Sequence, residues 1–285
     1  LGDPASVELR AVAHAADDLR DARLRVLHDA SFVDDPTRLL RLARYSARLG
    51  FAVEDHTAAL ADAAVAEGAL QTVSGARVGA ELRLLLGESD AVAALDAAAG
   101  LGLLAALHDG LVWDRQLAGR ALGLLPGDGR PELVLLASCA VEVDRAELAS
   151  WLNRLEFTAR ERDVVVAAAT RSRELAAALS DGRSASRVAR ALRSAPAEAV
   201  ALAGALGPGA AARSWLDDLR HVRLEIDGED LLAAGVPGGP DVGRGLEAAL
   251  GRKLDGELAP GRDAELAEAL RAAGLPPAGR PAPGE

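Results

Sequence analysis

The sequence predicts an all-α protein, and composition and patterning both support this. Half of the 285 residues are hydrophobic, yet only 2% are aromatic. Runs of valine, isoleucine and threonine that would favour strands are nearly absent, whereas apolar residues recur at helical spacing along the chain. We therefore expect an array of many helices with no sizeable sheet. The length is enough for one large core or for two to three small ones.

Composition also limits the classes of function. A net charge of −11 argues against indiscriminate nucleic-acid binding, because contact with phosphates needs local positive charge. No apolar run reaches the length of about eighteen residues that a membrane span needs, so we expect no membrane partner. The single cysteine, Cys139, lies in an apolar stretch typical of a core. It cannot form an internal disulfide, which fits a reducing, cytoplasmic environment.

The chain contains no methionine, so Leu1 is not an initiator residue. We expect Leu1 to be an internal position of something longer, and residues 1–24 carry only a weak helical pattern. Asp35-Pro36 predicts the first clear helix start, because aspartate can accept hydrogen bonds from free amides and proline suits the first helical position. This helix should run to about Leu49, with Gly50 as its left-handed stop.

The next elements follow from similar signals. We expect a second helix over residues 55–70 and a third over 75–87, the latter capped by Ser74. From residue 89 to about Arg220, glycine and proline separate short helical segments. A new unit is expected to begin near Leu224, and the chain ends in a Pro/Gly-rich stretch that is typical of disorder.

The first helix carries an unusual concentration of charge. Between residues 20 and 48 the acidic chain has seven arginines against four aspartates. Spacings of three, three and four residues put the arginines of the helix on one face. These four arginines are Arg38, Arg41, Arg44 and Arg48.

Asp35 and Arg38 together could recognise a nucleobase. A carboxylate only accepts hydrogen bonds and a guanidinium only donates them. Cytosine and adenine share an amino donor beside a ring-nitrogen acceptor, so an acceptor and a donor held side by side match both bases. Uracil and guanine reverse this arrangement and would leave polar groups unpaired. The structural alternative is an ordinary cap and a solvated or salt-bridged arginine row.

The run from Arg25 to Phe51, "RVLHDASFVDDPTRLLRLARYSARLGF", resembles the entry to the neck of class II tRNA nucleotidyltransferases. This family includes the CCA-adding enzymes and related bacterial poly(A) polymerases. Its nucleotide-selecting motif, acidic–Asp–x–x–Arg, falls on Asp34, Asp35 and Arg38, with Asp34 in place of the usual glutamate. The other matching positions are Arg25-Val26-Leu27, Ser31-Phe32, Pro36, Arg41, Arg44-Tyr45 and Arg48-Leu49-Gly50-Phe51.

The resemblance implies a role for each matching residue of this motif. Asp35 and Arg38 would contact the base of an incoming CTP or ATP, with Asp34 in support. Arg41 and Arg44 would support the nucleotide or the RNA phosphates. The partners implied are ATP, CTP and the 3′ end of a tRNA or another RNA, to which C, A or both are added.

A second family motif, Arg-x-x-x-Glu, falls on Arg77 and Glu81, where an ion pair four residues apart would steady the neck. The segment that begins at Leu224, "LEIDGEDLLAAGVPGGPDVGRGLEAALGRKLDGEL", resembles the family's C-terminal region. The implied division is a linker remnant over 1–24, a neck over 25–90, a body over 91–220, a tail over 221–273 and a disordered end over 274–285.

The sequence also departs from the family pattern. Family members carry an N-terminal catalytic head whose Asp-x-Asp pair holds two metal ions, and no such pair precedes Asp34. We therefore expect no catalytic residue and no metal ligand in this chain, and no activity of the chain alone. Mg²⁺ with ATP or CTP would belong to a protein that contains the head.

Two other functions stay open. One is a non-catalytic RNA-binding protein that recognises RNA by shape and phosphate contacts. The other is a metal-dependent phosphohydrolase built on the dipeptide His108-Asp109, with His56 and Asp144 as further ligands. The acidic cluster of Asp227, Glu229 and Asp230 could also suggest a metal site, but a helix cap at a glycine turn explains it better.

Overall fold

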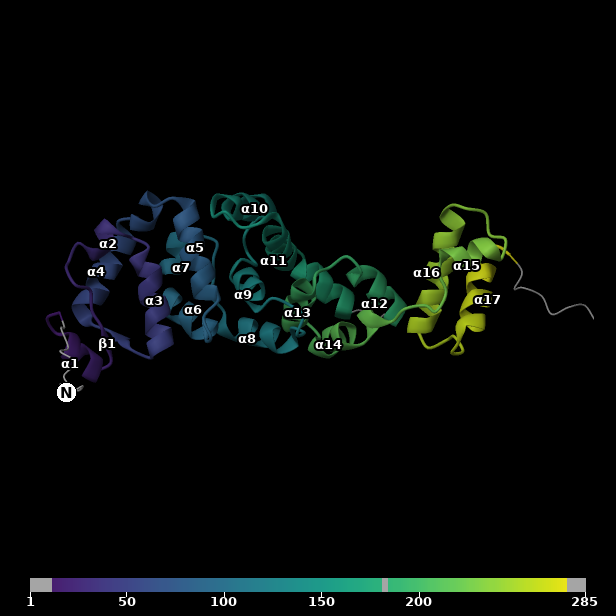
Figure 1. The fold of residues 1–285 in the computed structure, drawn as a ribbon, viewed down its shortest axis with the longest axis horizontal. Helices are drawn as coiled ribbons and strands as arrows, with labels where there is room; N and C mark the ends of the chain where they lie inside the picture. The colour runs from purple at the N-terminus through teal and green to yellow at the C-terminus, as the bar shows by residue number, and fades with distance from the viewer. Residues whose placement is uncertain (1–11, 181–183, 276–285) are drawn as a thin grey trace, which may run out of the picture. The chain divides into compact units, whose positions relative to one another are not determined.

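The computed structural model describes residues 12–180 and 184–275 (Figure 1). The predicted all-α class is confirmed: these residues form α-helices α1 to α17, two short 3₁₀ helices and one pair of two-residue strands. The chain divides into two compact units, which we call unit 1 (residues 1–119 and 130–170) and unit 2 (residues 120–129 and 171–285). The finer division into linker, neck, body and tail stays a prediction. Among the described residues, no helix is both long enough and apolar enough for a membrane span.

Unit 1 holds the elements nearest the predicted site. Their order is α1 (Ala15–Arg20), β1 (Arg23–Leu24), α2 (Ser31–Asp34), α3 (Arg38–Leu49), β2 (Ala52–Val53), α4 (Asp55–Ala66), η1 (Ala69–Thr72), α5 (Gly75–Leu86), α6 (Ala91–Gly100), α7 (Leu103–Leu107), α8 (Arg115–Leu124), α9 (Pro131–Cys139), α10 (Arg145–Arg154) and α11 (Ala159–Ser180). Along the chain, one boundary between the two units falls inside α8, one between α8 and α9, and one inside α11.

Helix α3 begins two residues later than the Asp35-Pro36 signal predicts. The Asp35 carboxylate does accept a hydrogen bond from the Thr37 amide (3.1 Å), but the first turn is tighter than an α-helix, with Arg38 N donating to Asp35 O at 3.1 Å. Gly50 ends the helix in the left-handed conformation, as predicted (φ 66°). The apolar face of α3 is buried against α5 and α6.

The second predicted helix is divided into two. Helix α4 ends at Ala66, and Gly68 takes a left-handed conformation (φ 70°) before the 3₁₀ helix η1 begins. An α-helix cannot continue through such a residue, so residues 55–70 do not form one helix. Ser74 precedes α5 as predicted, but its hydroxyl makes no capping hydrogen bond.

Two glycines let helix α5 approach the turn between α10 and α11. A Cβ atom on Gly75 would lie 2.0 Å from the Arg154 carbonyl oxygen, and one on Gly79 would lie 2.0 Å from that of Leu155. Arg83, one turn further along α5, donates to the Leu155 carbonyl at 3.1 Å. Its guanidinium carbon lies 4.3 Å from the centre of the Phe157 ring. This contact fixes α5, which in turn holds α3.

The two-residue strands join the segment before α2 to the end of α3. β1 pairs in parallel with β2, and the backbone amides of Ala52 and Glu54 donate to the carbonyls of Ala22 and Leu24 at 2.9 and 3.0 Å. Residues 23–28 are therefore held beside α3.

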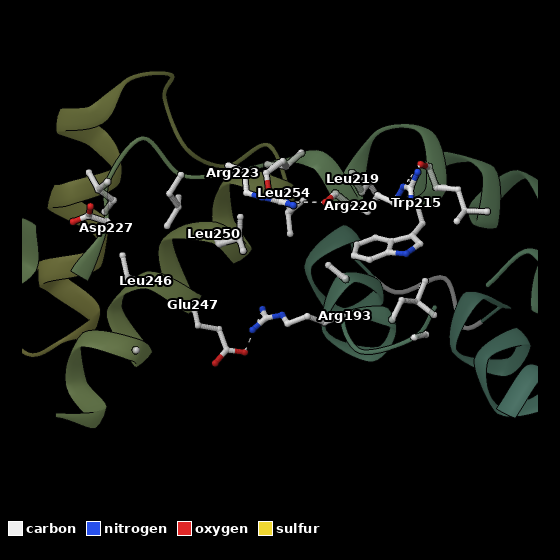
Figure 2. A pocket seen from close by; sticks show the side chains of 18 of the residues that line it. Arg193, Trp215, Leu219, Arg220, Arg223, Asp227, Leu246, Glu247, Leu250 and Leu254 are labelled. Carbon is white, nitrogen blue, oxygen red and sulfur yellow. Dashed lines mark hydrogen bonds and ion pairs between the residues drawn. The ribbon is translucent and has the colours of Figure 1, made fainter. Parts of the chain in front are cut away.

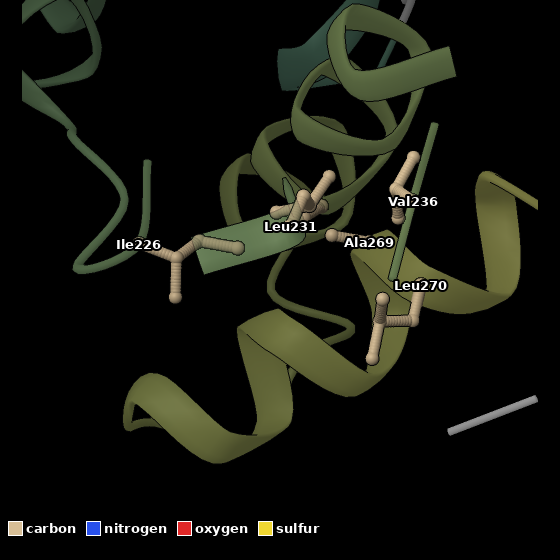
Figure 3. Packing of buried hydrophobic residues seen from close by; sticks show 6 residues of the cluster. Ile226, Leu231, Val236, Ala269 and Leu270 are labelled. Atoms are coloured by element: carbon tan, nitrogen blue, oxygen red, sulfur yellow. The ribbon is translucent and has the colours of Figure 1, made fainter. Parts of the chain in front are cut away.

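Unit 2 contains α12 (Ala185–Leu192), α13 (Ala197–Leu206), α14 (Gly209–Asp217), η2 (Leu219–His221), α15 (Gly228–Ala233), α16 (Pro240–Leu254) and α17 (Arg262–Ala272). Helices α15 to α17 enclose a small apolar cluster that includes Ile226, Leu231, Val236, Ala269 and Leu270 (Figure 3). Asp227 caps α15 by accepting from the amides of Glu229 and Asp230. The cap interpretation of this acidic cluster is confirmed.

Candidate functional site

The predicted arginine helix borders a cavity of about 410 Å³ in unit 1. One wall is the segment of residues 24–28, another is the start of α2, and the third is the face of α3 that carries Arg38 and Arg41. The lining residues are Leu24, Arg25, Val26, Leu27, His28, Ser31, Phe32, Arg38, Arg41, Leu42 and Tyr45. The lining includes no carboxylate, so its charged side chains are cationic.

Arg38 and Arg41 differ from the other arginines around this cavity. Arg38 Nη1 donates to the backbone carbonyl of Ser31 (3.3 Å), and Arg41 Nη2 donates to the hydroxyl of Tyr45 (3.3 Å). Both acceptors are neutral, and no carboxylate in the described ranges forms an ion pair with either guanidinium. Their positive charge is therefore available to an anionic or acceptor-bearing ligand.

The neighbouring arginines are already paired with carboxylates. Arg25 binds Asp18 and Glu54 at 3.0 and 3.1 Å. Arg48 binds Glu88 with two hydrogen bonds of 2.9 and 2.6 Å. The arginines on this face of α3 therefore have different contacts. Arg48 links α3 to Glu88, just after α5, whereas Arg38 and Arg41 line the cavity.

Asp35 stands beside the cavity rather than in its lining. Its Oδ1 atom accepts three hydrogen bonds, from the amide (3.1 Å) and hydroxyl (2.7 Å) of Thr37 and from Arg77 Nη2 (2.9 Å). None of the described residues donates to Oδ2. The Thr37 hydroxyl bond, followed by the Thr37 amide and the charges of Arg77 and Arg38, holds the pKa of the Asp35 carboxyl below its usual range against the opposing effect of burial. One oxygen of an ionised carboxylate is thus left to accept.

Asp34 is exposed, and its Oδ2 atom lies 3.8 Å from His28 Nε2. The structure gives it no contact with Asp35 or Arg38 that would support them directly. Its place in the nucleotide-binding set stays a prediction.

The expected ion pair between Arg77 and Glu81 is wrong. Both side chains reach from α5 to the α3 region instead: Arg77 binds Asp35 at 2.9 Å, and Glu81 binds Arg44 at 2.7 Å. The two residues therefore connect α5 to the α3 region through separate contacts, and their role in supporting the neck stays a prediction. Spacing along one helix favoured the local pair, and the packing of α3 against α5 offered each residue a closer partner.

Arg44 is buried, with only 8% of its side chain exposed. Its guanidinium binds Glu81 and also Glu88, whose Oε1 lies 3.2 Å from Nε. It also lies 5.2 Å from the centre of the Tyr45 ring. This position suits a residue that joins α3 to α5 and supports Tyr45, and a direct contact of Arg44 with phosphate stays a prediction.

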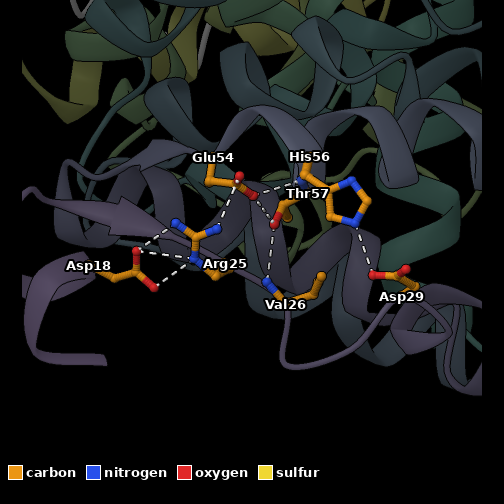
Figure 4. Close-up of polar contacts among 7 residues, drawn as sticks. All are labelled: Asp18, Arg25, Val26, Asp29, Glu54, His56 and Thr57. Carbon is orange, nitrogen blue, oxygen red and sulfur yellow. Dashed lines mark hydrogen bonds and ion pairs between the residues drawn. The ribbon is translucent and has the colours of Figure 1, made fainter. Parts of the chain in front are cut away.

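A polar network fixes the wall of residues 24–28 (Figure 4). Arg25 bridges Asp18 and Glu54, as described above. Thr57 accepts from the Val26 amide (3.1 Å) and donates its own amide and hydroxyl to Glu54 (2.9 and 3.0 Å). The Thr57 amide is the largest of the effects that lower the pKa of Glu54 to about 2. The segment is thereby anchored to the first turn of α4.

Unit 2 contains a larger cavity of about 940 Å³ (Figure 2), mainly apolar and lined by Trp215 and several leucines. Its arginines already have acceptors. Arg220 binds Asp128 at 2.7 Å, Arg223 donates to the carbonyls of Arg220 and Val222, and Arg193 lies 3.9 Å from Glu247. Size alone would favour this cavity, but two of its three arginines are paired with carboxylates, whereas Arg38 and Arg41 contact only neutral acceptors.

The residues of the phosphohydrolase hypothesis do not meet. His108 Nδ1 accepts from the Gly110 amide (3.0 Å) and its Nε2 lies 3.3 Å from Glu147. His56 binds Asp29 at 2.9 Å, and Asp144 caps α10. Within residues 12–180 and 184–275, no group of three or more His, Cys, Asp or Glu side chains is placed to hold a metal. Burial raises the pKa of the Cys139 thiol to about 12, as expected for a core cysteine.

Sequence reasoning missed three residues of this site. Thr37 and Tyr45 lie within the motif, but the resemblance implies no role for either. The spacing of Arg41 and Tyr45, four residues apart on one helix face, is a signal that could have predicted their contact. Glu88 joins Arg44 and Arg48 from 40 or more residues away. Nothing in the local sequence signals such a long-range pair.

Comparison with known proteins agrees with the motif. No family model matches the sequence. The chain is 45% identical over 95 residues to the A-adding tRNA nucleotidyltransferase of Geobacter sulfurreducens, covering 33% of this chain and 11% of that enzyme. It is 44% identical over 81 residues to the same enzyme of Halalkalibacterium halodurans, covering 28% and 19%. The matches thus span only a small part of the length of these relatives.

Solved structures extend the likeness across the chain. A CCA-adding enzyme in complex with ATP aligns with a TM-score of 0.78 and 25% identity, over 90% of this chain and 63% of that one. The Thermotoga maritima CCA-adding enzyme in complex with tRNA aligns with a TM-score of 0.77 and 24% identity, over 90% and 66%, and shows a shared fold. The chain therefore resembles the tRNA nucleotidyltransferases in its motif, in part of its sequence and in its fold.

Proposed function

We propose that this chain carries the nucleobase-selecting and RNA-binding helical region of a nucleotidyltransferase that adds C, A or both to the 3′ end of tRNA or another RNA. Asp35 and Arg38 would read the base of CTP or ATP. Arg41 would bind the nucleotide beside them, Arg44 would support it from the core, and Asp34 would complete the acidic pair. Arg77 and Glu81 would hold this arrangement against α5.

One observation carries the proposal. Of the arginines on α3, the two that face the cavity are the two without a carboxylate partner in the described structure. Arginines that serve only to stabilise a helix are typically paired or solvated, as Arg44 and Arg48 are paired here. Two free guanidinium groups at a cavity are instead suited to a ligand with acceptors and negative charge.

The chemistry of selection follows from the two side chains. The ionised Asp35 carboxylate would accept from the amino group of cytosine or adenine through Oδ2, while Arg38 would donate to the adjacent ring nitrogen. Uracil and guanine would present an acceptor to the carboxylate and a donor to the guanidinium. Both contacts would then be lost and polar groups left unpaired, which strongly disfavours binding.

Magnesium and RNA complete the proposal. We assign Mg²⁺ to the triphosphate of the nucleotide and to a catalytic head of the kind that the family carries, where two metal ions would stabilise the displacement. ATP, CTP and tRNA appear with the solved CCA-adding enzymes of the same fold, which supports the same ligands for this chain.

Equilibrium binding tests the proposal. We expect CTP and ATP to bind the chain at least about tenfold more tightly than UTP and GTP, as loss of one charged hydrogen bond implies. The Asp35→Ala and Arg38→Ala variants should lose this preference and keep the helical circular dichroism spectrum. Arg48→Ala is the matched control on the same helix and should keep the preference for CTP and ATP. Equal affinity of the wild-type chain for all four nucleotides would exclude the proposed selection.

In a protein that also carries a catalytic head, the same variants should lose discrimination during synthesis. Asp35→Ala or Arg38→Ala should then incorporate UTP at a rate closer to those of CTP and ATP. Unchanged incorporation ratios would contradict the assignment of these two residues.

A further inference from the structure

We propose that Thr37 is a specificity-determining residue of this site, because its amide and hydroxyl hold Asp35 Oδ1 and so present Oδ2 to the base. This inference rests on the proposed function and deepens it. Thr37 would not touch the nucleotide, so it is a positioning residue.

The contacts of Thr37 point to this role. Its side chain is almost completely buried, with 3% of the residue exposed, and a buried hydroxyl needs a hydrogen-bond partner. The acceptor of the hydroxyl proton is Asp35 Oδ1, at 2.7 Å. The Thr37 amide reaches the same atom at 3.1 Å. Both donors of one residue thus converge on one carboxylate oxygen.

This convergence leaves the two oxygens of Asp35 unequal. With Arg77 added at 2.9 Å, Oδ1 receives three donors, which exceeds the two lone pairs of a carboxylate oxygen. Oδ2 receives no donor from any residue in the described ranges. A carboxylate whose orientation is fixed in this way can present Oδ2 in one direction only, and selection between amino and carbonyl groups needs that fixed direction.

Local backbone structure explains why residue 37 is suited to the task. Pro36 has a fixed φ and no amide proton, so the first free amide after Asp35 belongs to Thr37. The tight turn that precedes α3 brings this amide and the adjacent hydroxyl back towards the carboxylate of Asp35. Arg77 alone could not replace them, because 57% of its side chain is exposed and it comes from another helix.

The test compares Thr37→Val, Thr37→Ser and a matched control in the full chain. Valine keeps the shape and the amide but removes the hydroxyl, whereas serine keeps the hydroxyl. Thr158→Val is the control, since Thr158 donates its amide and hydroxyl to Glu161 (both 2.9 Å) in the turn before α11. Dissociation constants of CTP, ATP, UTP and GTP are measured for each protein. The titration of the Asp35 carboxyl is followed by ¹³C NMR without nucleotide.

We expect Thr37→Val to reduce the preference for CTP and ATP by about tenfold, which is the effect of one hydrogen bond to a charged group. Its Asp35 carboxyl should titrate at a higher pH than in the wild-type chain, because the hydroxyl stabilises the ionised form. Thr37→Ser should restore both properties, and Thr158→Val should change neither.

A Thr37→Val protein that is folded and keeps the wild-type preference would overturn the inference. If the wild-type chain itself showed no preference among the four nucleotides, the proposed function would fail instead. The titration of the Asp35 carboxyl would then still show whether the Thr37 hydroxyl stabilises the ionised carboxylate. An unchanged titration midpoint in Thr37→Val would overturn this part of the inference as well.

Discussion

At the scale of single residues, the partners of a side chain decide what it can do. Arg38, Arg41, Arg44 and Arg48 are the same residue type on one helix, and the sequence ranks none of them above the others. In the folded chain Glu81 and Glu88 neutralise the last two, while the first two contact only neutral acceptors. The sequence could place the arginine helix and its Asp35 start, but not this division, because both carboxylates come from distant positions.

Tyr45 provides a test at this scale. Its hydroxyl accepts from Arg41 at 3.3 Å, and Tyr45→Phe removes the acceptor without removing the ring. We expect affinity for CTP, ATP and UTP to fall by the same factor of about fivefold. The loss of one hydrogen bond is worth about 1 kcal/mol, and in the proposed arrangement Arg41 binds the nucleotide without contacting the base. Titration calorimetry measures this. A change confined to CTP and ATP would mean that Arg41 contacts the base.

At the scale of elements, close packing holds the site in position. The helical pattern predicted α3, its stop at Gly50 and the start of α5. It did not predict the end of α4 at Ala66, because the left-handed conformation of Gly68 is one of several conformations open to glycine. It also could not show that Gly79 lies against the Leu155 carbonyl, since that contact is tertiary.

The contact of α5 with the α10–α11 turn predicts the effect of Gly79→Ala. The new Cβ atom would lie 2.0 Å from the Leu155 oxygen, so the helix and the turn must separate. We expect a loss of about 2 kcal/mol in the free energy of unfolding, measured by urea denaturation. Gly119→Ala in α8, where a Cβ atom meets nothing within 4 Å, should instead stabilise the chain by up to about 1 kcal/mol. Equal effects of the two substitutions would contradict the packing described here.

The anchor between the cavity wall and α4 predicts a dependence of stability on pH. The folded pKa of Glu54 is about 2, below its ordinary value of 4.5. Its stabilising effect is therefore complete above the ordinary value and is lost as the pH falls towards 2. We expect Glu54→Gln to reduce the fall in the thermal unfolding midpoint between pH 5 and pH 2. Glu67→Gln, at the other end of α4, is the control and should leave that fall unchanged.

At the scale of the whole molecule, the chain has two compact units, and the candidate site lies in unit 1. Composition and helical patterning predicted the all-α class, and the resemblance to one family covers most of the chain. The match to the family's short motifs ends at Glu81, and the arginines that follow are scattered along the sequence with no single patch.

Unit 2 has its own ion pair with a buried carboxylate, which allows a test of this division. Glu265 is 1% exposed and binds Lys253 Nζ at 2.5 Å and the Glu225 amide at 2.6 Å. Loss of the Glu265 carboxylate leaves the Glu225 amide and the partly exposed Lys253 ammonium without this acceptor, which we expect to cost about 2 kcal/mol. We expect Glu265→Ala to lose about that much stability, with hydrogen exchange accelerated in α15 to α17. Affinity for CTP and ATP should not change, and a parallel loss of affinity would show that the site depends on unit 2.

A crystal structure of the chain with CTP would show whether Asp35 and Arg38 bind the amino-bearing edge of the base. We predict that the cytosine amino group donates to Asp35 Oδ2 while Arg38 donates to the ring nitrogen beside it. Cytosine bound away from both side chains, or held with its amino group towards Arg38, would contradict the claim.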